Sequence, residues 1–274
     1  MFLDYKIIIV IPAGRKQYLD ILFPQLLKYS EIVDEYRIWV NTTNEDDIKF
    51  MTSFVEKNPK FILERLTVPY RGNASINSFF KNCYETKTVY IRFDDDIIII
   101  DDLFSFKNFL KFRIENPEYF LIFANILNNN IINNINQRVG TLPTDKYIAD
   151  YSCMGNYWTL PQYSEYAHYD ILKIIEETGT LSSFHINLIW RFMNYERVSI
   201  NCISWLGDEF KDFEGIVIGD EEDWLTTKKP KEIKKMNCMF GGFTVIHYAF
   251  YTQRPHLDKT NILSLYKSIY SLLM

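Results

Sequence analysis

The chain has 274 residues, of which 47% are hydrophobic, and a formal net charge of −5. This length allows a full hydrophobic core in one large domain, so neither a disulfide nor a metal is needed to hold the fold together. The negative charge argues against a dedicated nucleic-acid binder, because phosphate backbones demand basic surfaces. Aromatic residues make up 16% of the chain, enough to supply both a core and a sugar- or base-binding surface.

The four cysteines are far apart in sequence and form no C-x-x-C pair. We therefore expect reduced thiols in a reducing compartment. The short apolar run near the N-terminus lacks the cleavage site of a signal peptide. No apolar stretch reaches the ~18 residues that a membrane span needs. The sequence thus predicts a cytoplasmic protein with no transmembrane segment.

Strands and helices are expected to alternate over residues 1 to about 100. Apolar, β-branched runs predict strands at residues 6–11, 36–40, 64–68 and 89–93. Helical spacing of apolar residues predicts the intervening helices, at residues 16–30, 46–57 and 73–85. Such alternation predicts βαβ units, and hence an α/β fold with a central, mostly parallel, twisted sheet and helices on both faces.

The periodicity is less regular after residue 100. Helices are predicted at residues 103–115, 164–178, 182–195 and 261–274. Strands are predicted at residues 120–124, 215–218 and 242–246. Residues 127–160 are rich in Asn, Tyr and Gly and predict irregular chain. The last helix is amphipathic, which fits core packing and also allows peripheral membrane contact. We expect one domain over residues 1–274.

Three consecutive carboxylates, Asp94, Asp95 and Asp96, directly follow the predicted strand 89–93. Adjacent carboxylates repel one another, so placing them at the end of a buried strand is costly unless a cation is present. In open α/β sheets, ligands bind at the carboxyl ends of the strands. A D-x-D segment there suits Mg²⁺ or Mn²⁺ shared with a substrate diphosphate.

The loop after the first strand reads Pro12-Ala13-Gly14-Arg15 and contains no dinucleotide-binding or P-loop pattern. Its small residues allow a ligand to approach the backbone closely. Arg15 can pair with a phosphate or stack on a base.

The order of these segments resembles the GT-A fold of nucleotide-sugar-dependent glycosyltransferases of the D-x-D type. Such enzymes begin with an apolar strand ending in Ile-Pro, carry a second strand ending in a polar loop that meets the base, and place D-x-D after a further strand. The matching segments here are residues 9–12, 39–44 and 90–96, and residues 71–77 resemble a G-x-x-x-x-x-N-type segment. The resemblance covers about residues 5–105, and the rest more loosely.

The resemblance implies a nucleotide-binding half, about residues 1–105, and an acceptor-binding and catalytic half, about residues 106–274. The donor-binding residues that it implies are Pro12, Ala13, Gly14, Arg15, Asn41, Thr43, Arg71, Asn77, Asp94, Asp95 and Arg254. It also implies a Mn²⁺ or Mg²⁺ ion held by Asp94, Asp96 and a late histidine. His247 fits that position, and His256 is the alternative.

A second acidic cluster, Asp220-Glu221-Glu222-Asp223, lies at the position where inverting members of this fold carry a general base. Such a base removes a proton from the acceptor hydroxyl as that hydroxyl attacks the anomeric carbon. Glu221 is the first choice, followed by Asp220 and then Glu222. The other interpretation of the cluster is a helix N-terminus, which acidic side chains stabilise.

The resemblance therefore implies a metal-dependent glycosyltransferase that moves a sugar from a UDP-sugar, with GDP as the second choice of nucleotide, to a glycan or other hydroxyl acceptor with inversion. Two alternatives remain open. One is a sugar nucleotidyltransferase, whose first loop also carries an A-G…R segment. The other is a non-catalytic domain that only binds glycans. No segment within residues 125–215 identifies the donor sugar or the acceptor.

Overall fold

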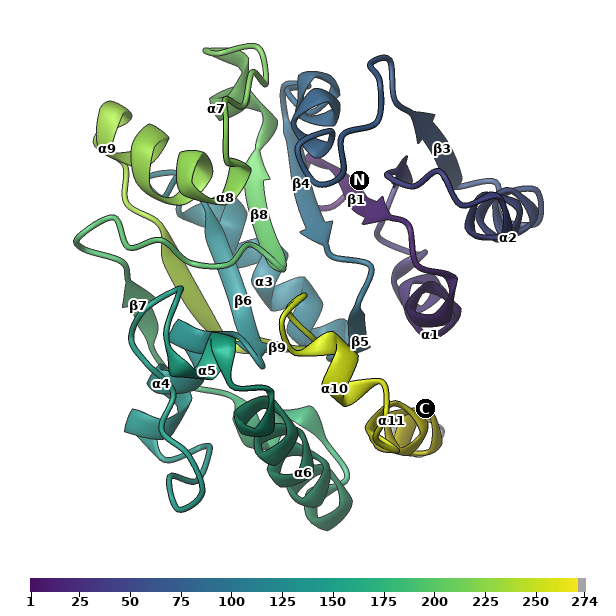
Figure 1. Ribbon diagram of the computed structural model, residues 1–274. Coiled ribbons are helices and arrows are strands. Elements are labelled where there is room, and N and C mark those ends of the chain that lie inside the picture. Colours follow the sequence, from purple (N-terminus) through teal and green to yellow (C-terminus); the bar gives the residue numbers. More distant parts are fainter. Residues whose placement is uncertain (271–274) are drawn as a thin grey trace.

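The computed structural model describes residues 1–270 and contains a single nine-stranded mixed sheet flanked by helices (Figure 1). The strands are β1 Lys6–Ala13, β2 Glu35–Val40, β3 Phe61–Arg65, β4 Thr88–Phe93, β5 Ile97–Ile100, β6 Ile122–Leu127, β7 Ile189–Arg191, β8 Cys202–Leu206 and β9 Cys238–His247. Their order across the sheet is β3-β2-β1-β4-β8-β6-β9-β5, and β7 pairs with β9.

The α-helices are α1 Lys16–Leu26, α2 Glu45–Val55, α3 Leu103–Glu115, α4 Asn130–Val139, α5 Asn156–Thr159, α6 Pro161–Thr178, α7 Gly207–Lys211, α8 Glu221–Asp223, α9 Lys229–Ile233, α10 Arg254–Leu257 and α11 Ile262–Tyr270. Short 3₁₀ turns are η1 Leu27–Tyr29, η2 Ile76–Asn82 and η3 Leu181–Phe184. A π-helical turn, η4 Trp224–Lys228, joins α8 to α9.

The N-terminal half confirms the predicted α/β pattern. β1, β2, β3 and β4 are mutually parallel, and β1 lies between β2 and β4. Residues Ile7–Ile11 of β1 are completely buried, as their continuous apolar run predicts. The third strand begins three residues earlier than expected, and the helix predicted at 73–85 is the shorter 3₁₀ turn η2.

The C-terminal half departs further from the prediction. Residues 182–195 form η3 and β7 in place of a helix, because β7 pairs with β9. The strand predicted at 215–218 is a loop in which Ile216 and Ile218 are exposed. A strand that was not predicted, β8, precedes this loop in sequence and lies antiparallel between β4 and β6. Residues 127–160 contain helix α4, whose low-propensity asparagines are buried and hydrogen-bonded.

The strand directions explain where a site can form. β8 is antiparallel to both β4 and β6, so β6 runs parallel to β4, and β9 runs parallel to β6. The carboxyl ends of β1, β2, β4, β6 and β9 therefore share one edge of the sheet with the start of β8. At this edge, the Asp94 amide donates a 2.9 Å hydrogen bond to the Asn201 carbonyl and so joins the end of β4 to the start of β8. Ligands of α/β sheets bind at such an edge.

Helices α6, α10 and α11 gather at one end of the molecule (Figure 1). α11 packs against α6 and β5, and its apolar residues Ile262, Tyr266 and Ile269 are buried there. This packing accounts for the amphipathic face of the tail without a membrane, and residues 271–274 of the predicted helix lie outside the described part. No helix among residues 1–270 is long and apolar enough to cross a bilayer.

Candidate active site

An open cleft of about 1000 Å³ lies along the carboxyl edge of the sheet. Nearly all the residues that the sequence singled out line this cleft, from the Pro12–Arg15 loop to Arg254. Thr43 and Arg71 do not line it. Both are exposed, and their neighbours Thr42 and Tyr70 face the cleft in their place.

Asp95 ties the first loop to the end of β4. The Gly14 amide donates to Asp95 Oδ2 at 2.9 Å, and Arg15 Nε donates to Asp95 Oδ1 at 3.0 Å. A side chain at position 14 would not fit, because its Cβ would come within 2.9 Å of the Asn41 carbonyl oxygen. Asp95 thus shapes the loop and uses the charge of Arg15 to do so.

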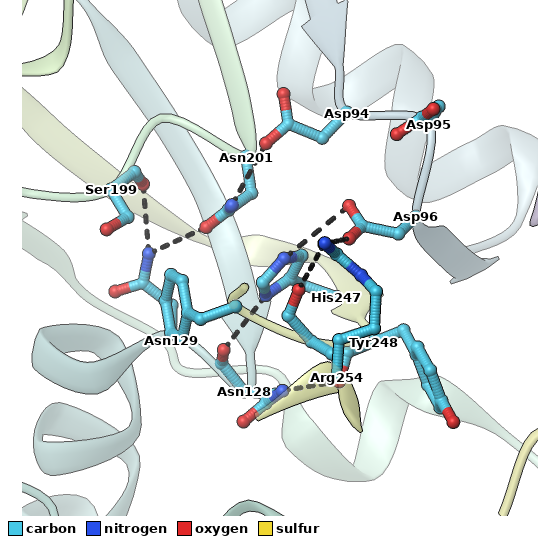
Figure 2. Close-up of polar contacts among 12 residues, drawn as sticks. Asp94, Asp95, Asp96, Asn128, Asn129, Ser199, Asn201, His247, Tyr248 and Arg254 are labelled. Atoms are coloured by element: carbon cyan, nitrogen blue, oxygen red, sulfur yellow. Dashed lines mark hydrogen bonds and ion pairs between the residues drawn. The ribbon is translucent and has the colours of Figure 1, made fainter. Parts of the chain in front are cut away.

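Asp96 is buried and is surrounded by three cationic or ionisable groups, of which Figure 2 shows His247 and Arg254. Its Oδ2 pairs with Arg254 Nη2 at 2.9 Å and with Arg15 Nη1 at 3.1 Å. Its Oδ1 faces His247 Nε2 at 3.5 Å. Burial raises the pKa of Asp96, but the charges of Arg15, His247 and Arg254 outweigh it and hold that pKa below its ordinary value.

Asp94 does not join the other two predicted metal ligands. Figure 2 shows it turned toward Asn201, which donates to its Oδ2 at 3.0 Å. Its Oδ1 accepts from Arg92 Nη2 at 2.8 Å. Within residues 1–270, no group of three or more His, Cys, Asp or Glu side chains is arranged to hold a metal ion. The structure thus gathers two of the three predicted ligands, Asp96 and His247.

The orientation of the His247 ring is fixed from behind. His247 Nδ1 lies 3.1 Å from the backbone oxygen of Asn128, which can only accept, so Nδ1 carries a proton (Figure 2). Nε2 is then the atom presented to Asp96 and the cleft. The alternative histidine, His256, pairs with Glu165 at 2.6 Å and does not line the cleft. Geometry therefore favours His247 over His256 for a role in the site.

The second acidic cluster divides into three different environments. Asp220 caps α8 by accepting from the Asp223 amide, and it pairs with Arg197 at 2.9 Å. Glu222 Oε1 accepts from Arg197 Nε at 2.8 Å and from the Cys153 thiol at 2.9 Å. The helix-capping interpretation of the cluster thus holds for Asp220.

Glu221 differs from both neighbours. Its Oε1 pairs with Arg92 Nη1 at 3.1 Å, whereas its Oε2 is buried and has no hydrogen-bond partner among the described residues. Burial raises the pKa of Glu221 to about 7, although Arg92 opposes the shift. A carboxylate with a free oxygen and a pKa near neutrality is suited to accept a proton.

Two asparagines line another part of the cleft: Asn41 follows the end of β2, and Asn77 lies at the start of η2. Asn77 Nδ2 donates to the Gly219 carbonyl at 2.8 Å. The Oδ1 atoms of Asn41 and Asn77 are buried in the cleft lining with no partner among the described residues. Buried polar atoms are normally hydrogen-bonded, so these two acceptors are suited to donors on a ligand such as a base or ribose.

Sequence reasoning missed the groups that connect these parts. Arg92 bridges Asp94 and Glu221, and Asn201 and Asn128 hold Asp94 and His247. Arg92 did carry a signal: it is a charged residue within an otherwise apolar, buried strand, and buried charges are paired. Asn128 and Asn201 carried no such signal, because their partners, His247 and Asp94, lie more than a hundred positions away in sequence.

Comparison with solved structures supports the fold described above. No family model matches the sequence, and no curated protein does. Among solved structures, the chain resembles GalNAc-T7 bound to UDP, GalNAc and Mn²⁺, with a TM-score of 0.53 at 10% identity. The match covers 97% of this chain and 48% of that one, so this chain spans about half its length. The likeness confirms the predicted GT-A-like α/β domain.

Two further structures give lower scores. S. aureus TarS 1-349 matches with a TM-score of 0.49 at 11% identity, over 97% of this chain and 71% of that one. The 4-diphosphocytidyl-2C-methyl-D-erythritol synthase from Anaerococcus prevotii matches with a TM-score of 0.46 at 8% identity, over 97% of both chains.

Proposed function

We propose that the chain is a glycosyltransferase that moves a sugar from a nucleoside-diphosphate sugar to a hydroxyl acceptor. One observation carries this proposal: Arg92 bridges Asp94 and Glu221, so two acidic clusters that are far apart in sequence meet within the span of one guanidinium. One cluster adjoins Arg15, Arg254 and His247, groups suited to a diphosphate and its counter-ion. The other presents a carboxylate with the pKa of a general base.

The charges at Asp95 and Asp96 support a role for a divalent cation. Two carboxylates and the two guanidiniums of Arg15 and Arg254 sum to zero, so these four groups alone do not attract a diphosphate. Asp96 Oδ1 and His247 Nε2 face each other, and both are ligand atoms. Asp96 and His247 would be the protein ligands of a divalent cation, and the imidazole would favour Mn²⁺ over Mg²⁺.

The chemistry of the chain's own groups follows from their geometry. The metal would neutralise charge on the departing diphosphate. Arg254, whose Nε has no partner among the described residues, is placed to bind the same group. Glu221 Oε2 takes the proton of the acceptor hydroxyl as its oxygen bonds to the anomeric carbon. The bond from that carbon to the phosphate oxygen breaks, and the nucleoside diphosphate leaves with the electron pair. This direct displacement inverts the anomeric centre.

The test is a panel of UDP- and GDP-sugars, each incubated with the protein and Mn²⁺, with release of the free nucleoside diphosphate as the readout. We expect release from one class of donor, its loss on chelation, and inverted product when an acceptor is supplied. An α product from an α-linked donor, identified by NMR, would exclude inversion.

The same assay separates the alternatives. A sugar nucleotidyltransferase would instead release pyrophosphate from a nucleoside triphosphate and a sugar 1-phosphate. A glycan-binding domain would release neither product while still binding saccharides in calorimetry. Either result would overturn the proposal.

A further inference from the structure

Two aromatic side chains with no role in the proposed chemistry face the cleft. The rings of Trp158 and Tyr251 pack edge to face, with centroids 5.1 Å apart, and both residues line the cleft. Tyr251 is 67% exposed. A pair of aromatic rings that lines a cleft is a candidate place for a ligand to bind.

The pair is held in place by its backbone. Thr252 Oγ1 donates to the Trp158 carbonyl at 2.5 Å, and Gln253 Nε2 donates to the Tyr157 carbonyl at 2.9 Å. Gln253 is fully buried, so this attachment is shielded from water. The loop after β9 and helix α5 thus form one unit that presents both rings. A site fixed before the ligand arrives costs less ordering entropy on binding.

The unit adjoins both halves of the proposed chemistry. Three residues beyond Tyr251, Arg254 pairs with Asp96. Five residues before Trp158, the Cys153 thiol donates to Glu222, next to the proposed base. The two rings therefore line the same cleft as Arg254 and Glu221.

The surroundings of the pair indicate what kind of molecule fits. A sugar ring has an apolar C–H face that packs on an aromatic ring, and hydroxyl groups at its edge that need hydrogen-bond acceptors and donors. The carboxylates of Asp220 and Glu222 and the guanidinium of Arg197 lie along the same cleft. Two rings beside many polar groups are too small an apolar area for a lipid chain, and the carboxylates disfavour an acidic peptide.

We propose that Trp158 and Tyr251 form the acceptor subsite and that the acceptor is a saccharide whose ring packs on these two side chains. The inference rests on the proposed glycosyltransferase function and names its acceptor class.

The experiment uses the full chain with Mn²⁺ and its active donor, and it measures transfer to a panel of methyl glycosides, short oligosaccharides, peptides and lipid-linked acceptors. Trp158→Ala and Tyr251→Ala should each raise the KM for the saccharide acceptor about tenfold, since an aromatic contact contributes at about that level. This rise should exceed any change in the Kd for the donor measured without acceptor. Tyr166→Ala, which removes a tyrosine on α6 that is 40% exposed and does not line the cleft, should change neither.

The possible outcomes are distinct. If the wild-type protein releases no nucleoside diphosphate from any donor, the proposed function fails. If transfer occurs but both variants keep the wild-type acceptor KM, the subsite assignment is overturned while the function stands. A wild-type protein that transfers to a peptide or a lipid-linked acceptor but to no saccharide overturns the acceptor class. Trp158→Phe, which keeps an aromatic ring, should retain most of the affinity and guards against a folding defect.

Discussion

The cleft contains two runs of three acidic residues, 94–96 and 220–222, and their environments differ. In the first run every carboxylate has a cationic partner: Arg92 pairs with Asp94, Arg15 pairs with Asp95, and Arg15 and Arg254 pair with Asp96. These ion pairs hold the three side chains of the run in place. Its function in this arrangement is to organise charge, and proton transfer is not expected of it.

In the second run, Arg197 forms ion pairs with Asp220 and Glu222 but not with Glu221, which lies between them in sequence. Glu221 shares Arg92 with Asp94, and its buried Oε2 has no hydrogen-bond partner within residues 1–270. Acidic residues that are consecutive in sequence therefore need not share a chemical role. Nearby cations lower the pKa of a carboxylate and burial raises it. The balance of these two effects decides whether the carboxylate stays charged or can transfer a proton.

The largest expected effect comes from Glu221→Gln. The amide keeps the size and hydrogen-bonding capacity of the side chain but cannot accept the proton. Turnover should fall by about 10²–10⁴, the range that general-base catalysis supplies, with little change in donor affinity. Asp223→Asn, which alters an acidic residue that pairs with Lys228 and does not line the cleft, is the matched control and should retain activity.

A stability measurement accompanies this variant. Folding raises the pKa of Glu221 to about 7, so the folded state favours the neutral form, and ionisation of Glu221 lowers stability as pH rises through that value. Glutamine removes this cost. The Tm of the variant at pH 8 should therefore equal or exceed that of the wild type. Full turnover would contradict the assignment of Glu221 as the base, whereas a lower Tm would contradict the destabilising effect of its ionisation.

The two runs also show how far sequence reasoning reaches. Asp94–Asp96 could be placed at a sheet edge, because an apolar run fixes the strand before them and ligands of α/β sheets bind at that edge. The preference for Glu221 over Asp220 and Glu222 as the base rested only on the resemblance to GT-A glycosyltransferases. The structure distinguishes the three by contacts with Arg92, Arg197 and Cys153, which come from distant segments and leave no local pattern.

The same limit applies to the fold. The continuous apolar strands of the parallel half could be predicted, because they are buried on both faces. In the C-terminal half, the predicted strands 120–124 and 242–246 overlap β6 and β9. β7 and β8 could not be predicted, because they are defined by the strands that they pair with. Helix α4 escaped notice because its asparagines are poor helix formers in isolation. Their side chains meet buried partners here, as Asn133 does with Tyr157 at 2.7 Å.

The second prediction tests the fixed run. Asp96→Asn removes the charge that Arg15, Arg254 and His247 surround. We expect turnover to fall by about 10²–10³, comparable to the loss of one preorganised electrostatic contact, and the midpoint of Mn²⁺ titration to rise. His247→Gln should do the same, whereas His256→Gln, which only breaks a pair with Glu165, should not. Equal effects of the two histidine variants would contradict the assignment.

The third prediction breaks the link between the runs. Arg92→Lys keeps one positive charge but cannot bridge Asp94 and Glu221, because a single ammonium lacks the fork of a guanidinium. With less cationic contact opposing burial, the pKa of Glu221 should rise further. The acidic limb of the kcat/KM profile should therefore move to higher pH, with about a tenfold loss at pH 6.5. A profile that loses height without moving would show that Arg92 acts only on folding.

The smallest effect is expected from Asp220→Asn. Asparagine caps a helix as well as aspartate does, so the hydrogen bond from the Asp223 amide survives. The variant loses only the pair with Arg197, which is exposed and is worth at most about 1 kcal/mol. Stability in urea should change by no more than that, and turnover by a few-fold. Because Asp220 was the second choice for the base, the result is informative in both directions. A loss of turnover as large as that of Glu221→Gln would move the proton-accepting role to Asp220 and remove the contrast drawn between the two runs.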